Sequence, residues 1–310
     1  MATRRVFLHL HAGLSKMELR AADQIKGRLH VLGVRVDTCL LSLPSADLAI
    51  FFGTAKFRPS ASHLVKLLVS RLHHNFMVFE SPVIGRVTQE LSHEEPIFRA
   101  GMGGFFADRG FDYALEQQAD TTALRLFYGK SFGFPDVRFC GQGVVGLALQ
   151  IPGDASVTGI DQIQQTAAIA TRIRRSESFG NARIIVRTPP LLASRLDPRL
   201  AYLEAIPGLE IQVGTNNNKE EFFRTIEFLV TFSSTMGVDA VTRGIPACGL
   251  DSRSFLRLVS SSTLDDLLER RIDLNPNYMN IFANTTWRIK DIFGPEFNRV
   301  VMRIGSSESH

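Results

Sequence analysis

The sequence predicts an α/β protein made of two Rossmann-like domains that face one another across a cleft. Three observations lead to this fold class. Strand and helix patterns alternate regularly from Gly141 onward, a similar series begins at Arg5, and the segment between them is less regular. A length of 310 residues suits two domains of ordinary size. We place the domains at residues 1–140 and 141–265, and we expect helices in residues 266–310 to brace both.

The amino-terminal half contains short apolar runs typical of buried strands, separated by helical or turn patterns. Its longest irregular loop is predicted at the glycine-rich stretch Gly101–Gly110. The predicted strands are Arg5–Leu10, Val34–Leu40, Asp47–Phe52 and Phe76–Glu80, and the predicted helices are Lys16–Leu32 and Leu64–Leu72.

The second half alternates more strictly, which indicates a parallel sheet with helices on both faces. The predicted strands are Val144–Leu149, Ala182–Arg187, Leu209–Val213, Glu227–Phe232 and Pro246–Leu250. The predicted helices are Thr158–Arg175 with Thr158 as its cap, Asp197–Ala205, Lys219–Ile226 and one that begins at Thr235. Two more helices, Leu264–Arg270 and Tyr278–Ile292, are too few for a third domain and form the predicted bracing segment.

The composition, 45% apolar and 21% charged, is that of a globular protein. No apolar run approaches the roughly 20 residues of a membrane helix, and the first residues lack a signal-peptide pattern, so we expect a cytoplasmic location. A net charge of +4 is too small and dispersed to indicate nucleic-acid binding. The three cysteines, Cys39, Cys140 and Cys248, form no CxxC or Cys/His cluster, so neither disulfides nor a bound metal are expected.

The loops at the carboxyl ends of the predicted strands carry the candidate chemistry, because open α/β sheets bind ligands at that edge. Asp154, in the loop Gln150–Ser156, is the first candidate, although Pro-Gly-Asp is also common turn chemistry. The segment Ser233–Gly237 is the strongest phosphate candidate, because hydroxyls and a glycine open a helix. Its alternative is plain N-capping by Ser234 or Thr235.

The amino-terminal half adds weaker candidates. Glu80 ends an apolar strand, where a carboxylate is costly unless it is paired or employed, and an ion pair with Arg86 is the alternative. Phe105, beside Gly103 and Gly104, could form the wall of an acceptor cleft. The chain has neither a Walker lysine motif nor GxGxxG, which argues against an ATPase or a nicotinamide enzyme.

Five motifs, each at a predicted strand end and in the same order, resemble those of bacterial capsular polysaccharide biosynthesis proteins, including the retaining β-Kdo glycosyltransferases. The resemblance covers roughly residues 45 to 295 and ends in a tryptophan-containing segment, Asn284–Gly294. The motifs are Glu80 with Gly85-Arg86, Gly101-Met102-Gly103-Gly104-Phe105, Gln150-Ile151-Pro152-Gly153-Asp154-Ala155-Ser156, Ile185-Val186-Arg187-Thr188-Pro189-Pro190, and Ser233-Ser234-Thr235-Met236-Gly237-Val238-Asp239-Ala240 with Gly244-Ile245-Pro246.

The resemblance implies a GT-B-like architecture and a glycosyltransferase that moves a sugar, Kdo or a related acidic sugar, from a CMP-, UDP- or GDP-linked donor to a glycan or glycolipid. Asp154 matches the aspartate implicated as the covalent nucleophile, and Glu80 is our candidate for the second acid/base group. No cofactor is expected besides the donor itself. The donor-binding candidates are Gln150, Ser156, Arg187, Ser233, Ser234, Thr235, Gly237 and Asp239, and the acceptor-binding candidates are Arg86, Gly103, Gly104 and Phe105.

Two positions depart from the family pattern. Pro189 stands where the family usually has the histidine of Pro-His-Pro, and Asp239 stands where it usually has the glutamate of Gly-x-Glu-Ala. We expect Arg187, two residues before Pro189, to replace the histidine at the donor. The alternatives are a catalytically silent member that binds glycans, or contacts a membrane or an assembly complex, and a transferase that acts on modified DNA.

Overall fold

The computed structural model describes residues 5–9, 16–38, 47–53, 75–80, 97–103, 135–152, 154–157, 159–190, 197–215 and 217–301, together with residues 68, 71, 82 and 119. The chain divides into two compact units. One comprises residues 1–123 and 279–310, and the other comprises residues 124–278. No helix within the described residues is both long enough and apolar enough to cross a membrane.

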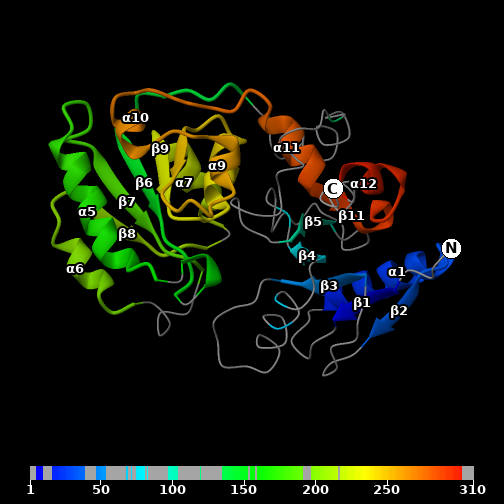
Figure 1. Cartoon of the computed structure of the whole chain (residues 1–310). Helices are drawn as coiled ribbons and strands as arrows, with labels where there is room; N and C mark the ends of the chain where they lie inside the picture. Colours follow the sequence, from blue (N-terminus) through cyan, green and yellow to red (C-terminus); the bar gives the residue numbers. More distant parts are fainter. Residues whose placement is uncertain are drawn as a thin grey trace. The chain divides into compact units, whose positions relative to one another are not determined.

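The first unit contains a six-stranded mixed sheet with the order β11-β5-β4-β3-β1-β2 (Figure 1). Strands β1 to β4 are parallel, whereas β5 and β11 run antiparallel to their neighbours. The strands are β1 Arg5–His9, β2 Arg35–Thr38, β3 Leu48–Phe52, β4 Phe76–Glu80, β5 Ile97–Met102 and β11 Thr286–Arg288. The helices are α1 Lys16–Val31, α11 Tyr278–Thr285, the 3₁₀ turn η3 Ile289–Asp291 and α12 Pro295–Val300.

Two of these strands differ from the sequence-based prediction. Residues 101 and 102 were assigned to a loop but complete β5, and Gly103 closes the strand with φ +67°, a conformation that glycine adopts without strain. The predicted helix Tyr278–Ile292 ends at Thr285, because the next three residues pair with β5 as β11. The predicted helix Leu64–Leu72 lies mostly outside the described residues.

An aromatic cluster forms the core of the first unit and includes the carboxy-terminal segment. The ring centroids of Phe52 and Phe98 lie 5.6 Å apart, and those of Phe79 and Phe297 lie 6.5 Å apart. Trp287 packs edge-on against Phe297 at 5.1 Å. Each of these phenylalanines is fully buried. Residues after 278 therefore contribute to the core of the first unit, and the division of the chain falls at residue 123 instead of the expected 140.

The second unit contains a fully parallel five-stranded sheet with the order β10-β9-β6-β7-β8. Its strands are β6 Val144–Ala148, β7 Arg183–Arg187, β8 Leu209–Gln212, β9 Phe228–Thr231 and β10 Ala247–Gly249. Its helices are the 3₁₀ turn η1 Ala155–Val157, α5 Gln162–Arg175, α6 Leu200–Glu204, α7 Lys219–Thr225, α8 Met236–Val241, α9 Leu256–Val259 and α10 Leu264–Leu268.

Side chains on β6 explain why helices cover both faces of this sheet (Figure 1). Val145 and Leu147 belong to the cluster that buries the apolar face of α5. Gly146 points the other way, and a Cβ there would lie only 2.9 Å from the ring of Phe222 and 3.0 Å from Ile226. The absence of a side chain at Gly146 thus lets α7 pack directly on the central strand.

The amino terminus of α5 is capped differently from the prediction. The carboxylate of Asp161 accepts hydrogen bonds from the main-chain N–H groups of Ile163 and Gln164, at 3.1 and 3.2 Å. The predicted cap, Thr158, lies outside the described residues. The helix therefore begins at Gln162, four residues after the predicted start, and η1 precedes it in the connection from β6.

The strand order defines where a ligand should bind in the second unit. The chain moves from β6 outward to β7 and β8, then returns to the other side of β6 for β9 and β10. The connections after β6 and β9 thus leave the sheet in opposite directions and open a crevice between the carboxyl ends of these two strands. Asp154 follows β6 and Ser233 follows β9, so both border this crevice.

Candidate functional site

The loops after β6 and β9 are joined by the side chain of Gln150. Its carbonyl oxygen, Oε1, accepts hydrogen bonds from the main-chain N–H of Ser233 at 2.8 Å and from the Ser233 hydroxyl at 2.9 Å. The hydroxyl also lies 2.8 Å from the carbonyl oxygen of Ser156 and can donate to one of the two acceptors at a time. Two motifs that are far apart in the sequence are therefore held together at the switch point of the sheet.

The amide nitrogen of Gln150 points to the loop that carries Asp154. Its Nε2 donates to the Ser156 hydroxyl at 2.6 Å, and that hydroxyl lies 2.8 Å from Asp154 Oδ1. The main-chain N–H of Ser156 also donates to Oδ1, at 3.0 Å. Asp154 therefore stabilises a turn, which was the alternative to a catalytic role for this residue. Gln150, Asp154, Ser156 and Ser233 are all partly exposed. The structure thus brings together four of the predicted site residues.

The beginning of α8 satisfies its own polar groups. The Ser234 hydroxyl accepts from the N–H of Met236 at 3.2 Å, and the N–H of Ser234 donates to Thr231 Oγ1 at 3.2 Å. Thr235 occupies the N-cap position without a side-chain capping bond. These contacts match the capping alternative for Ser234, and the free N–H groups predicted for phosphate binding are reduced accordingly.

Arg187 was expected to bind the donor, but in the structure it has hydrogen-bond partners inside the second unit. Arg187 is 4% exposed, and its guanidinium donates to Gln212 Oε1 at 2.8 Å and to the carbonyl oxygen of Thr215 at 2.6 Å. The same group lies over the ring of Phe222, 5.3 Å from its centroid, and burial lowers the pKa of Arg187. Arg187 was expected to point into the donor cleft, but its fork instead ties β7 to the segment after β8.

Two predicted donor-binding residues on α8 are also interior. Gly237 is buried, and a Cβ there would come within 2.5 Å of Leu256 and 3.0 Å of Thr231, so this glycine is required by packing. Asp239 is 2% exposed and forms an ion pair with Lys219. In this structure, therefore, both residues hold α8 in place and do not line an open surface.

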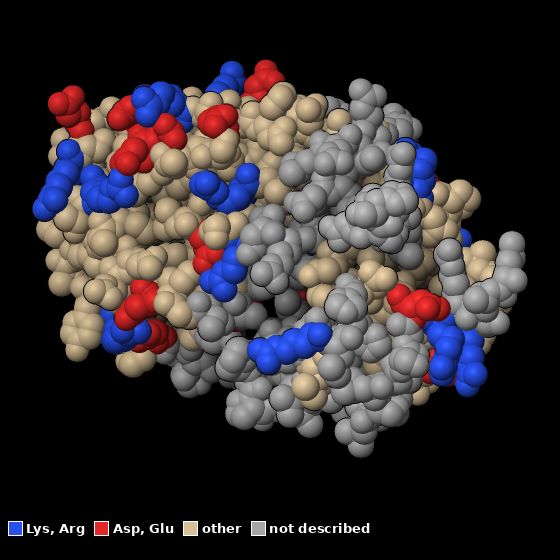
Figure 2. All heavy atoms as spheres, viewed as in Figure 1, with Lys and Arg blue, Asp and Glu red and all other residues tan. Residues whose placement is uncertain are grey.

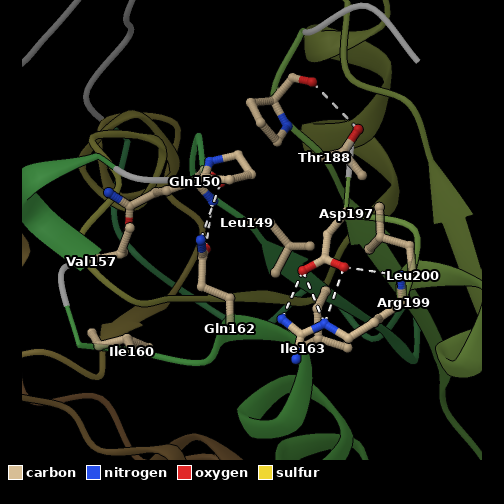
Figure 3. Close-up of a pocket in the computed structure, with 12 residues that line it drawn as sticks. Leu149, Gln150, Val157, Ile160, Gln162, Ile163, Thr188, Asp197, Arg199 and Leu200 are labelled. Atoms are coloured by element: carbon tan, nitrogen blue, oxygen red, sulfur yellow. Dashed lines mark hydrogen bonds and ion pairs between the residues drawn. The ribbon is translucent and has the colours of Figure 1, made fainter. Parts of the chain in front are cut away.

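A cavity of about 150 Å³ lies beside the Gln150 loop (Figure 3). Apolar side chains such as Val157 and Ile163 line it together with the amide of Gln162. That amide holds the backbone of Gln150 from both sides, because its Oε1 accepts from the Gln150 N–H at 2.8 Å and its Nε2 donates to the Gln150 carbonyl at 3.2 Å. Pro189, at the position of the family's histidine, lines the same cavity.

The rim of this cavity carries a compensated cluster of charges. Arg199 pairs with Asp197, with Nη2 and Oδ2 2.8 Å apart, and with Asp161, with Nη1 and Oδ2 2.7 Å apart. The hydrogen bonds from Arg199 lower the pKa of both aspartates. All three groups are partly exposed, so both carboxylates stay ionised near neutral pH and remain accessible from the cavity rim.

Sequence reasoning missed two charged residues in the same crevice. Arg253 pairs with Asp251, with Nη2 and Oδ2 2.6 Å apart, and the same nitrogen lies 3.4 Å from the carbonyl oxygen of Ser156. Burial alone would raise the pKa of Asp251, but the hydrogen bonds from Arg253 outweigh burial and lower it. Both residues follow β10, so the rule of examining strand ends would have found them had it been applied to the last strand as well.

The remaining candidates belong to the first unit. Glu80 ends β4 directly opposite Arg99 of β5, and Gly103 follows β5. Arg86, Gly104 and Phe105 lie outside the described residues. The proposed roles of all five in acid/base chemistry or acceptor binding stay predictions.

Charges of both signs lie beside one another on the described surface of the second unit, as Figure 2 shows around α5 and α6. Arg172 pairs with Asp265, and Arg183 with Glu210. This face therefore offers compensated charge instead of a basic surface for nucleic acid. Within the described ranges, no three His, Cys, Asp or Glu side chains gather in a way that could hold a metal ion.

Comparison with solved structures identifies the architecture. Thermosulfurimonas dismutans KpsC, described as a β-Kdo 2,4 transferase, superposes with a TM-score of 0.54 at 14% identity, covering 89% of each chain. The β-Kdo 2,7 transferase of the same KpsC gives a TM-score of 0.51 at 13% identity, covering 96% of this chain and 99% of that one. The chain has the fold of these β-Kdo transferases. The motif resemblance is thus confirmed at the level of the fold, which is GT-B-like.

Sequence comparisons alone do not reach this relationship. No family model matches the chain, and no curated protein matches it.

Proposed function

We propose that this protein is a retaining glycosyltransferase that moves a sugar from a nucleotide donor to a glycan or glycolipid acceptor. The observation that supports it best is the carboxylate of Asp154, which is held at the switch point of a parallel sheet, in a loop whose residues Gln150 and Val157 line a cavity. The fold shared with two β-Kdo transferases supports the same reaction class. Kdo or a related acidic sugar is the proposed donor sugar.

The proposed chemistry is a double displacement. An oxygen of Asp154 forms a bond to the anomeric carbon while the bond from that carbon to the nucleotide phosphate breaks, and the nucleotide leaves with the bonding electrons. The acceptor oxygen then displaces Asp154 and gives its proton to a second group, for which Glu80 is proposed. Two inversions retain the configuration of the sugar.

The donor is proposed to extend from the cavity to the crevice. The mixed apolar and amide lining around Gln162 suits a planar or ring-shaped group, and Arg253 brings a positive charge to the loop that carries Asp154. A catalytically silent protein is the second candidate. It is favoured by Pro189, which cannot donate a hydrogen bond where the family has a histidine, and by Arg187, whose fork has internal partners.

Donor cleavage tests the proposal. The purified chain is incubated with CMP-, UDP- and GDP-linked sugars, and released nucleotide is measured with and without oligosaccharide, lipid-linked and DNA acceptors. Release that depends on Asp154, together with a sugar adduct on the Gln150–Ser156 peptide by mass spectrometry, is the expected result. Binding of a nucleotide without any cleavage would favour the silent candidate.

A further inference from the structure

We infer that Gln150 is a positioning residue that acts through Ser156 to hold the Asp154 carboxylate, and that it does not contact the donor. This inference deepens the proposed function, on which its catalytic meaning rests. It reverses the sequence-based assignment, in which Gln150 and Ser156 were donor-binding residues.

The direction of the amide is fixed by a main-chain group. The N–H of Ser233 can act only as a donor, so the group that faces it at 2.8 Å must be the oxygen of the Gln150 amide. The amide nitrogen must then face Ser156, where it lies 2.6 Å from the hydroxyl oxygen. Neither assignment depends on where a hydroxyl hydrogen is placed.

The direction of the Ser156 hydroxyl follows from the direction of the amide. A hydroxyl has one hydrogen to donate, and here its oxygen accepts from Gln150 Nε2. Its own hydrogen is therefore available for Asp154 Oδ1, which lies 2.8 Å away. The order of donation runs from Gln150 to Ser156 to Asp154, and each donor polarises the next.

Ser156 holds the resulting carboxylate at one oxygen. Oδ1 accepts from both the hydroxyl and the N–H of Ser156, at 2.8 and 3.0 Å. These bonds fix the plane of the carboxylate. Gln150 thereby links the loop after β9 to the orientation of the nucleophile.

Charged groups also lie near the relay, the chain of hydrogen bonds from Gln150 to Asp154. Arg253 lies 3.4 Å from the Ser156 carbonyl oxygen and is paired with Asp251. Arg199, with its two aspartates, lies on the rim of the adjoining cavity. None of these groups is altered by substitutions at Gln150 or Ser156, so their contribution is common to all variants compared.

A double-mutant cycle tests the relay directly. The proteins are wild type, Gln150→Met, Ser156→Ala and the double variant, with Gln165→Met as a matched control at an exposed position of α5. The carbon-13 chemical shift of the Asp154 carboxyl group at pH 7, assigned by its loss in Asp154→Asn, reports the hydrogen bonding of this carboxylate in each protein. This readout needs no donor, so it tests the relay whether or not the protein transfers sugar.

We expect Ser156→Ala to change the carboxyl carbon-13 shift of Asp154, because the hydrogen bond from the Ser156 hydroxyl is lost. Gln150→Met should change this shift by a smaller amount when the Ser156 hydroxyl is present and by almost nothing in the Ser156→Ala background. For donor cleavage, Gln150→Met should lower kcat roughly tenfold with little change in KM. Thermal unfolding establishes that each variant is folded.

Two results would overturn the inference. One is a change in the Asp154 carboxyl carbon-13 shift by Gln150→Met that is equal with and without the Ser156 hydroxyl, or no larger than that caused by Gln165→Met. The other is a loss confined to KM, which would return Gln150 to the donor-binding residues. An inactive wild type with the expected cycle would contradict the proposed function and leave the relay standing.

Discussion

The side-chain oxygen of Gln150 lies 2.8 Å from the main-chain nitrogen of Ser233, although 83 residues separate them in the sequence. The contact joins the loops after β6 and β9, and it decides which end of the Gln150 amide meets Ser156. One hydrogen bond between two loops therefore couples the packing of the sheet to the orientation of Asp154.

Asp154→Asn should abolish transfer while the protein stays folded. The amide keeps the shape of the carboxylate and can still accept the hydrogen bonds from Ser156, but it lacks the negative charge needed to attack an anomeric carbon. We expect kcat for donor cleavage to fall by roughly 10³-fold or more, with KM little changed. Asp265→Asn, an exposed aspartate of α10, is the matched control. Near-normal turnover of Asp154→Asn would exclude the residue as nucleophile.

Glu227→Gln should make stability less dependent on acidic pH. Glu227 is fully buried at the start of β9, where its carboxylate accepts from the N–H groups of Gln142 and Gly143 and pairs with Arg270 at 3.1 Å. Burial alone would raise the pKa of Glu227, but these contacts outweigh burial and hold the pKa below its usual value of 4.5. A lowered folded-state pKa means that the stabilisation is present above the unfolded-state pKa and is lost as the pH falls through the folded-state value.

The measurement is urea unfolding at pH 7 and below pH 4.5. At pH 7 we expect Glu227→Gln to lower the free energy of unfolding by about 1–3 kcal/mol. The difference from wild type should shrink as the solution is acidified. Glu210→Gln, which removes an exposed carboxylate, should change stability by less than about 1 kcal/mol. A wild-type advantage that stays constant with pH would show that the charge of Glu227 does not matter.

The fold and the loops that form the candidate site were largely predictable from the sequence, because both depend on local patterns. Apolar runs gave the strands, and the loops after them contained Asp154 and Ser233. The order of the strands in the sheet decides which loops are neighbours. That order depends on the whole sheet, so it could not be predicted from local patterns. The contact between Gln150 and Ser233 could not be read from either motif alone.

Two other expectations differ from the observed contacts for a related reason. Arg187 ends a predicted strand as a ligand-binding residue would, but its partners Gln212 and Thr215 come from a neighbouring strand and loop. The short strand Thr286–Arg288 was taken for helix because three residues carry no periodicity of their own. Its pairing with β5 overrides the local pattern.

Gly237→Ala should reduce stability more than nucleotide affinity. A Cβ at this position would come within 2.5 Å of Leu256, so α8 or α9 would have to move. We expect a loss of about 1–3 kcal/mol in the free energy of unfolding, measured by urea denaturation. Gly27→Ala in α1, where a Cβ meets nothing within 4 Å, should instead be neutral or stabilising by about 0.5–1 kcal/mol. Weaker nucleotide binding by Gly237→Ala at unchanged stability would restore the sequence-based assignment.

Arg187→Lys provides the sharpest contrast between a donor-binding and a structural arginine. A lysine keeps the positive charge, but it cannot donate to Gln212 and to the Thr215 carbonyl in parallel or lie flat over Phe222. We therefore expect the free energy of unfolding to fall by about 1–3 kcal/mol. Nucleotide affinity, measured by calorimetry with CMP, UDP and GDP, should stay close to that of wild type. Arg183→Lys, at the exposed beginning of the same strand, should change neither quantity. A clear loss of nucleotide affinity in Arg187→Lys without loss of stability would mean that the guanidinium leaves its internal partners when the donor binds. Arg187 would then take the role of the histidine that was expected at the position of Pro189.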